Sequence, residues 1–368
     1  MLILYVCLCC YKCYLCWEND ATMKNKNPRG LFDETFRLEK LSKQGDPLLL
    51  LKEKIDWEIF YPILETIFTK EDKGIGGRTP YDYLMMFKIL ILQRYYNLSD
   101  DQTEYQILDR LSFMRFLDLE LSDKVPDSKT VWLFKETIAQ SRMTEELFNT
   151  FEELLESKGY IGKEGKIVDA SFVEVPRQRN SREENKQIKE GKVPEEWYAN
   201  PHKLSQKDID AEWTKKNGET FYGYKNHVKG DQKSKFIEKY KVTAASEHDS
   251  KPAPDIMEEK DADQGMYGDS AYVGPAIEAA ILKNKMKNCI HEKGYKNKTL
   301  TEEQKECNKK KSSIRVRVEH IFGFIENSMH GSFIRCIGIV RAEATIGLMD
   351  LTYNLFRYIQ LQKVGYKG

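Results

Sequence analysis

The spacing of apolar residues divides the chain into two regions. From Leu31 to about Tyr160 the apolar residues recur at helical spacing, and polar capping residues interrupt the pattern. Ser99-Asp100-Asp101-Gln102 and Asp127-Ser128-Lys129-Thr130 are typical helix starts, and Thr79-Pro80 predicts another, because proline is favoured in the first turn. The pattern therefore predicts a bundle of short helices over residues 31–160, of a kind used both for DNA binding and for oligomerisation.

Near Lys166 the apolar period changes from helical to alternating. Strands rich in β-branched and aromatic residues are predicted over 166–175, 221–228 and 237–244. Shorter strands are expected before Asp269 and over 287–291, with helices after Pro275 and over 348–362. The polar stretch 176–219 reads as an insertion after the first strand. We therefore predict a mixed α+β protein, with a helical N-terminal domain (31–160) followed by an α/β domain (161–368).

The segment 309–327, K-K-K-S-S-I-R-V-R-V-E-H-I-F-G-F-I-E-N, carries two stripes when it is read as one helix. The apolar stripe is formed by Ile314, Val318, Ile321 and Ile325. The flanking stripe is formed by Arg315, Glu319, Phe322 and Glu326. Glu319 is thus expected at the edge of a buried face, close to basic residues suited to phosphate. A solvated amphipathic helix would give the same pattern.

Composition indicates a globular protein with a local basic face. The 368 residues include 58 Lys/Arg and 58 Asp/Glu, so the formal net charge is zero, which argues against an overall polycation. Residues 99–157 hold 6 Lys/Arg and 14 Asp/Glu, whereas residues 281–317 hold 12 Lys/Arg and 4 Glu. This asymmetry is compatible with a nucleic-acid site confined to the second region.

Residues 1–22 do not match the rest of the chain. Five of the eight cysteines fall within the first seventeen residues, and Lys12 interrupts the apolar run before it is long enough to span a bilayer. The features of a secretory signal are missing, and no partner motif supports a metal cluster. We expect residues 1–22 to be a non-native or disordered extension and Met23 to be the biological start.

Two acids stand where strands are predicted. Asp169 lies inside the apolar strand 166–175, and Asp269 ends a short strand just before a helix. A structural aspartate bonded to backbone donors is the alternative to a metal ligand. Together with Glu319, the order of elements matches an α/β domain of the ribonuclease H type, in which three carboxylates suit Mg²⁺. On the strand 221–228, Lys225 and His227 share one face and are candidate phosphate contacts, although a lone histidine is more often structural.

Several ordered motifs resemble those of DDE transposases of the bacterial insertion-sequence-five family. The resemblance runs from about Trp57 to the C-terminus and rests on G-R-T-P-Y-D-Y-L-M-M-F-K-I-L, P-D-S-K-T-V-W-L-F-K, V-D-A-S-F-V, W-T-K-K-N-G-E-T-F-Y-G-Y-K, V-T-A-A-S-E-H-D-S, G-D-S-A-Y and R-V-R-V-E-H-I-F-G. It implies that Asp169, Asp269 and Glu319 are the catalytic, metal-binding acids. It also implies a DNA transposase that cuts phosphodiester bonds at element ends and transfers strands.

The same resemblance implies the cofactors and partners. Mg²⁺ is the expected cofactor, with Mn²⁺ as a substitute, and the expected partner is double-stranded DNA, as terminal inverted repeats and as target. A homodimer on DNA, no membrane association and a cytoplasmic, nucleoid-associated location follow by analogy. The candidate DNA-binding residues are Lys215, Lys216, Lys225, His227, Lys309, Lys310, Lys311, Arg315 and Arg317.

Two positions depart from the wider transposase pattern. Ser312 and Glu326 stand where such enzymes often have a tyrosine and a lysine. The missing lysine bears on contacts to DNA ends more than on metal binding. Two alternatives therefore stay open: a nuclease of the same fold that cleaves without joining, and a catalytically inactive relative that only binds DNA.

Overall fold

A computed structural model describes residues 30, 32–68, 80–178, 180–216, 218–294 and 299–366. The predicted extension 1–22, the start at Met23 and the helix cap at Thr79 lie outside these residues. The chain forms two compact parts, which meet in sequence between Asp46 and Pro47. The first part contains helix α2 (Asp33–Lys43), which has no buried residue. All features below belong to the second part.

The N-terminal half of this second part is helical, as predicted. Its helices are α3 (Pro47–Lys54), η1 (Trp57–Phe60), α4 (Tyr61–Phe68), α5 (Tyr83–Tyr95), α6 (Asp100–Asp109), α7 (Leu111–Phe116), α8 (Ser128–Ser141) and α9 (Thr144–Ser157). The caps at Ser99 and Asp127 are confirmed, because both side chains accept backbone N–H groups of the next turn. The helix expected to start at Pro80 starts instead at Tyr83, where Asp82 accepts from the Met85 N–H at 2.6 Å.

The C-terminal half is built on a mixed six-stranded sheet. Its strands are β1 (Gly165–Glu174), β2 (Glu212–Lys216), β3 (Glu219–Asp231), β4 (Ile237–Ala244), β5 (Gly265–Tyr267) and β6 (Lys287–Asn288). β3 pairs antiparallel with β1, β2 and β4, whereas β5 is parallel to β1 and β6 is parallel to β5. The antiparallel strands β1, β3 and β4, followed by strands that run parallel to β1, confirm the predicted mixed fold of the ribonuclease H type.

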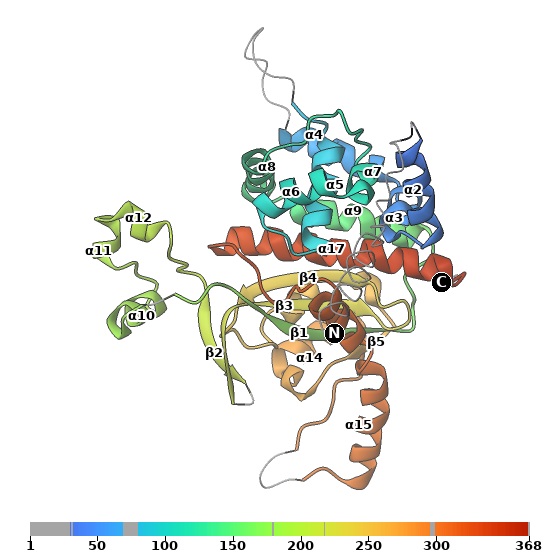
Figure 1. Cartoon of the computed structure of the whole chain (residues 1–368). Helices are drawn as coiled ribbons and strands as arrows, with labels where there is room; N and C mark the ends of the chain where they lie inside the picture. Colours follow the sequence, from blue (N-terminus) through green and yellow to red (C-terminus); the bar gives the residue numbers. More distant parts are fainter. Residues whose placement is uncertain are drawn as a thin grey trace, which may run out of the picture. The chain divides into compact units, whose positions relative to one another are not determined.

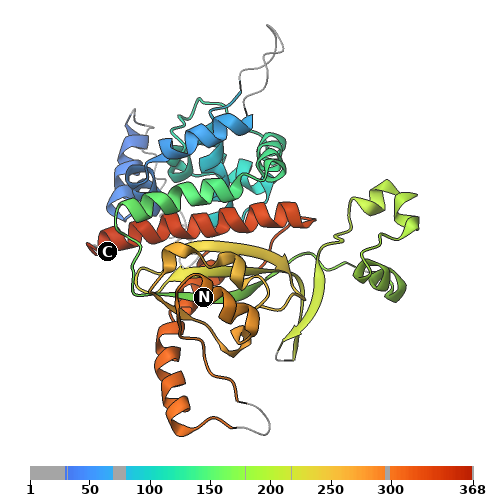
Figure 2. The same cartoon turned by 180° about the vertical axis from the view of Figure 1, so that it is seen from behind.

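Helices cover and connect the strands. They are α13 (Ala253–Ile256), η2 (Glu259–Asp261), η3 (Ser270–Tyr272), α14 (Pro275–Lys283), α15 (Glu302–Arg315), α16 (Val318–Gly323), the π-helical turn η4 (Phe324–Ser328) and α17 (Ile339–Lys363). α17 lies between the N-terminal helices and the sheet and contacts α5, α9 and β4 (Figures 1 and 2). It is buried along most of its length, so the helices and the sheet share one hydrophobic core. The domain division near residue 160 stays a prediction.

The polar insertion is folded around one tryptophan. It contains α10 (Arg182–Lys189), α11 (Glu195–Tyr198) and α12 (Pro201–Leu204), which lie apart from the sheet in Figure 1. Trp197 is fully buried, and its Nε1 donates to Glu184 Oε1 at 2.8 Å. The ammonium groups of Lys203 and Lys207 stand over the same ring. In the described parts of the chain, none of the helices is long and apolar enough to cross a membrane.

Candidate active site

A groove of about 840 Å³ is lined by residues from β1, β2, β3, the segment after β5, and the α15 to η4 region. One wall includes the stacked rings of Phe172 and Phe221, whose centroids are 4.2 Å apart. The charged residues that line the groove are Asp169, Glu174, Lys216, Glu219, Asp269, Arg315, Glu319 and Glu326. Six carboxylates thus stand against two cations, so the groove is strongly acidic.

Two parallel strands bring Asp169 and Asp269 to the same end of the sheet. In the pairing of β1 with β5, Ile167 lies opposite Tyr267. Each aspartate follows its paired residue by two positions, so both lie just past the end of the pairing between β1 and β5, while β1 itself continues beside β3. Burial, and to a smaller extent the negative charge of Asp269, raises the pKa of Asp169 to about 6.

Both aspartates also accept backbone hydrogen bonds. Asp169 Oδ1 accepts the N–H of Ala170 at 2.9 Å, and Asp269 Oδ1 accepts the N–H of Ala271 at 2.8 Å. The second bond caps the short helix η3. These bonds hold one oxygen of each carboxylate and leave the other oxygen for a different partner.

The segment that carries Glu319 is not the single helix that the sequence predicts. The helix ends at Arg315, and α16 begins at Val318 after a turn at Val316 and Arg317. The apolar stripe nevertheless packs inward as predicted, since Val318, Ile321 and Ile325 are buried and Ile314 is half-buried. The flanking stripe lies along the groove, with Arg315, Glu319, Phe322 and Glu326 all in its lining.

A glycine in β3 lets α16 approach the sheet. A Cβ atom added at Gly230 would stand 2.9 Å from the Cδ1 atom of Ile321, closer than real Cβ contacts. Ile321 therefore packs into the space above the glycine. Glu319, on the same helix, projects into the groove with 60 % of its side chain exposed.

Arg315 lies between two of the acids. Its Nη1 donates to Asp169 Oδ2 at 2.8 Å, and its Nη2 is 3.8 Å from Glu319 Oε1. The sequence places Arg315 one helical turn before Glu319, but the bond to Asp169, 146 residues away, is visible only in the fold.

Of the other basic candidates, Lys216 is the one that lines the groove. Its ammonium group is 5.6 Å from the centroid of the Phe172 ring and 3.8 Å from Asp249 Oδ2, and about half of the side chain is exposed. Lys215 is exposed on the same strand, outside the lining. A phosphate in the groove would therefore meet Lys216 and Arg315.

The structure contradicts direct DNA contacts by Lys225 and His227. The Lys225 ammonium is 2.7 Å from Asp249 Oδ1, and only 7 % of the residue is exposed. His227 is fully buried, with its Nε2 2.9 Å from the Thr243 hydroxyl, and burial lowers the pKa of its ring to about 4. β3 lies between two neighbouring strands and is buried on both faces, so alternation along it does not separate exposed from buried positions.

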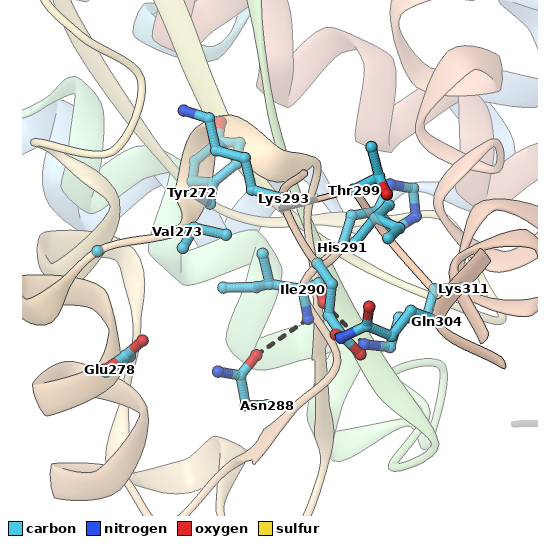
Figure 3. A pocket seen from close by; sticks show the side chains of 13 residues that line it. Tyr272, Val273, Glu278, Asn288, Ile290, His291, Lys293, Thr299, Gln304 and Lys311 are labelled. Atoms are coloured by element: carbon cyan, nitrogen blue, oxygen red, sulfur yellow. Dashed lines mark hydrogen bonds between the residues drawn. The ribbon is translucent and has the colours of Figure 1, made fainter. Parts of the chain in front are cut away.

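The remaining basic candidates lie on α15 and at its end. Lys309 and Lys310 are exposed. Lys311 faces a second hollow of about 470 Å³ (Figure 3), where its Nζ donates to the Ile290 carbonyl at 2.8 Å. Arg317 donates to the Gln232 carbonyl at 3.0 Å and does not line the groove.

Two residues beside the acids were missed at the level of sequence. Tyr272 is buried, and burial together with Asp169, Asp249 and Asp269 raises the pKa of its hydroxyl well above the ordinary value. Its place three residues after Asp269, within G-D-S-A-Y, was the available signal. His291 ends the strand predicted at 287–291, and its Nε2 is 3.3 Å from the Ser312 hydroxyl.

The donor chemistry of the groove fits a divalent cation. Carboxylate oxygens are the ligands that Mg²⁺ prefers, and Asp169, Asp269 and Glu319 all line one space. Beside them, Tyr272 Oη and Arg315 Nε are buried without a hydrogen-bond partner among the described residues, as expected next to a site for a polar ligand. Yet the structure, over the residues that it describes, holds no group of three His, Cys, Asp or Glu side chains arranged around one point. The acids share the groove, but Arg315 stands between two of them.

Two family models match the chain. The family model described as "Transposase DDE domain" matches residues 161–355. A second, described as "Transposase domain (DUF772)", matches residues 36–137. Among solved structures, the piggyBac transposase synaptic complex with hairpin DNA aligns with 12 % sequence identity and a TM-score of 0.40, over 88 % of this chain and 77 % of that one.

Proposed function

The chain belongs to the DDE transposase family, and from this premise we propose that its groove cuts phosphodiester bonds at the ends of a mobile DNA element and joins them to target DNA. The observation that carries the proposal is that Asp169, Asp269 and Glu319, which are far apart in sequence, line one groove.

We propose that these three side chains hold Mg²⁺, or Mn²⁺ in its place. DDE transposases depend on divalent metal, which would activate the attacking oxygen and stabilise the leaving oxygen. The charge of the groove supports this choice. Six carboxylates against two cations would repel a DNA phosphate, and bound divalent cations would offset that repulsion.

The chain's own cations would then position the DNA. Arg315 can bind a phosphate through two N–H groups, since its Nε has no partner in the described structure and its Nη2 is 3.8 Å from Glu319 Oε1. Lys216, on β2, adds a second positive charge to the lining of the groove. The exposed lysines of α15, Lys309 and Lys310, would follow the DNA backbone outside the groove.

We propose further that the protein works in the cytoplasm on double-stranded DNA, with terminal repeats and a target as its two substrates. Joining both ends of one element requires two active sites, so a homodimer on DNA is the simplest assembly.

A strand-transfer assay tests the function directly. Labelled duplexes that carry the ends of the element would be incubated with target DNA and Mg²⁺ or Mn²⁺, with the chelator EDTA as control. Metal-dependent joining is the expected result. Cleavage without joining would indicate a nuclease, and binding without cleavage would indicate an inactive relative. The inactive relative is worth testing because Glu326 lines the groove where such enzymes often have a lysine.

A further inference from the structure

Arg315 lies next to two of the acids that are proposed to bind a metal ion, so its guanidinium would compete with that ion. Its guanidinium contacts Asp169 Oδ2 at 2.8 Å and stands 3.8 Å from Glu319 Oε1, so one positive group partly neutralises two of the three acids. The other oxygen of Asp169 already accepts the Ala170 N–H. Both oxygens of Asp169 are therefore engaged in the protein without DNA.

A divalent cation at Asp169 and Glu319 would be repelled by this guanidinium. Like charges a few ångströms apart in a partly buried site interact strongly, because the surrounding protein screens them less than water does. Asp169 and Arg315 are both mainly shielded, with 17 % and 25 % of their side chains exposed. The arginine must therefore move away, or be neutralised by another anion, before the acids can bind metal tightly.

The surroundings of Arg315 allow such a movement. Arg315 is the last residue of α15, and the turn at Val316 and Arg317 separates it from the helix that carries Glu319. Its Nε is buried without a hydrogen-bond partner in the described structure, so the guanidinium is not fully bonded where it lies. A DNA phosphate would satisfy two of its N–H groups at once, which a single contact to Asp169 does not.

We propose that Arg315 is a positioning residue that holds Asp169 and Glu319 in the DNA-free protein and releases them to a divalent cation when a DNA phosphate takes its guanidinium. Metal and DNA would then each raise the affinity of the protein for the other. This inference rests on the proposed function, because it assumes that the same acids bind the metal.

The test measures Mn²⁺ binding rather than activity. Free Mn²⁺ would be followed by electron paramagnetic resonance during titration of the full chain, with and without a short double-stranded DNA at low salt. In the wild type, DNA should raise the Mn²⁺ affinity by about 5- to 150-fold, the usual range for coupled sites. Arg315→Gln should bind Mn²⁺ tightly without DNA, and the effect of DNA should largely disappear.

Two further arginine variants separate the role of the charge from general damage. Arg315→Lys keeps the positive charge, so its Mn²⁺ affinity without DNA should stay low. Arg357→Gln is the matched control, because that guanidinium bonds the Ser234 carbonyl outside the groove, and it should behave like the wild type. Circular dichroism would verify that each variant is folded.

The outcomes distinguish this inference from the proposed function. If Arg315→Gln binds Mn²⁺ no more tightly than the wild type, or if DNA leaves the wild-type affinity unchanged, the role of Arg315 is wrong. The wild-type measurement decides even if Arg315→Gln fails to fold. If Asp169→Asn binds Mn²⁺ as well as the wild type when DNA is present, the metal site itself is wrong, and with it the proposed function.

Discussion

Two clusters of charged side chains both include residues of β1 and β3, and they differ in how their charges are paired. The first is a buried cluster of Lys166, Lys229, Asp231, Glu238 and Asp261, each at most 3 % exposed. Its lysines reach carboxylate oxygens at 2.6 Å and 2.7 Å. The second cluster is the groove, in which six carboxylates share two cations and Glu319 is mostly exposed.

The charges of the buried cluster stabilise the fold, whereas the surplus carboxylates of the groove are available to bind a cation. In the buried cluster every carboxylate accepts from a lysine or a backbone N–H, so the charges cross-link β1, β3, β4 and η2. Burial alone would lower the pKa of Lys229, but Glu238, Asp261 and Glu258 raise it above its ordinary value. In the groove the charges do not balance, and a surplus of carboxylates in one hollow is typical of a site for cations.

The largest expected effect is on catalysis. Asp169→Asn, Asp269→Asn and Glu319→Gln should each lower the rate of strand cleavage by on the order of a thousandfold or more, because each removes a proposed metal ligand. Each variant should keep its free energy of unfolding within about 1 kcal/mol of the wild type, since none of these acids supports the core. Cleavage rates and urea denaturation would be measured together, and near-normal cleavage by any variant would remove that residue from the site.

The buried cluster should respond in the opposite way. Lys229→Met leaves Asp261 without its lysine and should cost about 3–5 kcal/mol of unfolding free energy, because an unpaired buried charge remains. Lys239→Met is the matched control, since Lys239 bonds Glu258 at 3.2 Å but is about a quarter exposed, and its loss should cost less than about 1 kcal/mol. Equal losses in the two variants would show that the buried pairing is not what stabilises the sheet.

One buried carboxylate, that of Asp350, belongs to neither cluster. Asp350 of α17 is fully buried, has no lysine partner in the described structure, and accepts both of its side-chain hydrogen bonds from Asn226. Burial raises its pKa to about 8, so the folded protein holds a proton here that the unfolded chain releases near pH 4. This contribution to stability is full at low pH and is lost as the pH rises towards 8.

Asp350→Asn should remove that loss. The free energy of unfolding of the variant should rise relative to that of the wild type between pH 4 and 8, and exceed it by at least about 1 kcal/mol at pH 8. Its amide can also donate to Asn226 Oδ1, which is buried without a partner in the described structure. Chemical denaturation across this pH range would check the prediction, with Asp350→Ala as the control that should be less stable than Asp350→Asn at every pH. A difference between wild type and Asp350→Asn that does not change with pH would contradict it.

The smallest effect concerns the exposed lysines of α15. The double variant Lys309→Gln/Lys310→Gln should fold normally and bind DNA more weakly at all sequences. The slope of log affinity against log salt should fall by up to about 2, because each lysine that contacts a phosphate contributes about 0.9. Fluorescence anisotropy at several salt concentrations would measure the slope, and an unchanged slope would place the DNA elsewhere.

Local patterns predicted the elements of this fold well. The strand predicted over 237–244 is β4 with the same bounds, and the caps at Ser99 and Asp127 form as expected, because both depend on neighbours in sequence. The polar stretch 176–219 was predicted only as an insertion, without its helices, because contacts between residues 13 and 19 positions apart hold it together. Two hydrogen bonds to Glu184, from Trp197 and from Lys203, stabilise the insertion, and no periodic pattern in the sequence predicts them.

The site was predicted less completely, for a similar reason. The sequence motifs pointed to three acids, and the fold places all three in one groove. They did not reveal that Arg315 bonds Asp169, that Tyr272 stands beside the acids, or that Lys225 and His227 are buried. Each of these facts depends on which strands are neighbours and which faces are covered.

The most direct test of the central claim is the position of Mn²⁺ in crystals of the protein bound to double-stranded DNA, located by anomalous scattering. We expect a peak within bonding distance of carboxylate oxygens of Asp169, Asp269 and Glu319, with Arg315 moved from Asp169 to a phosphate. A peak at other residues, or no peak in this groove with DNA present, would contradict it.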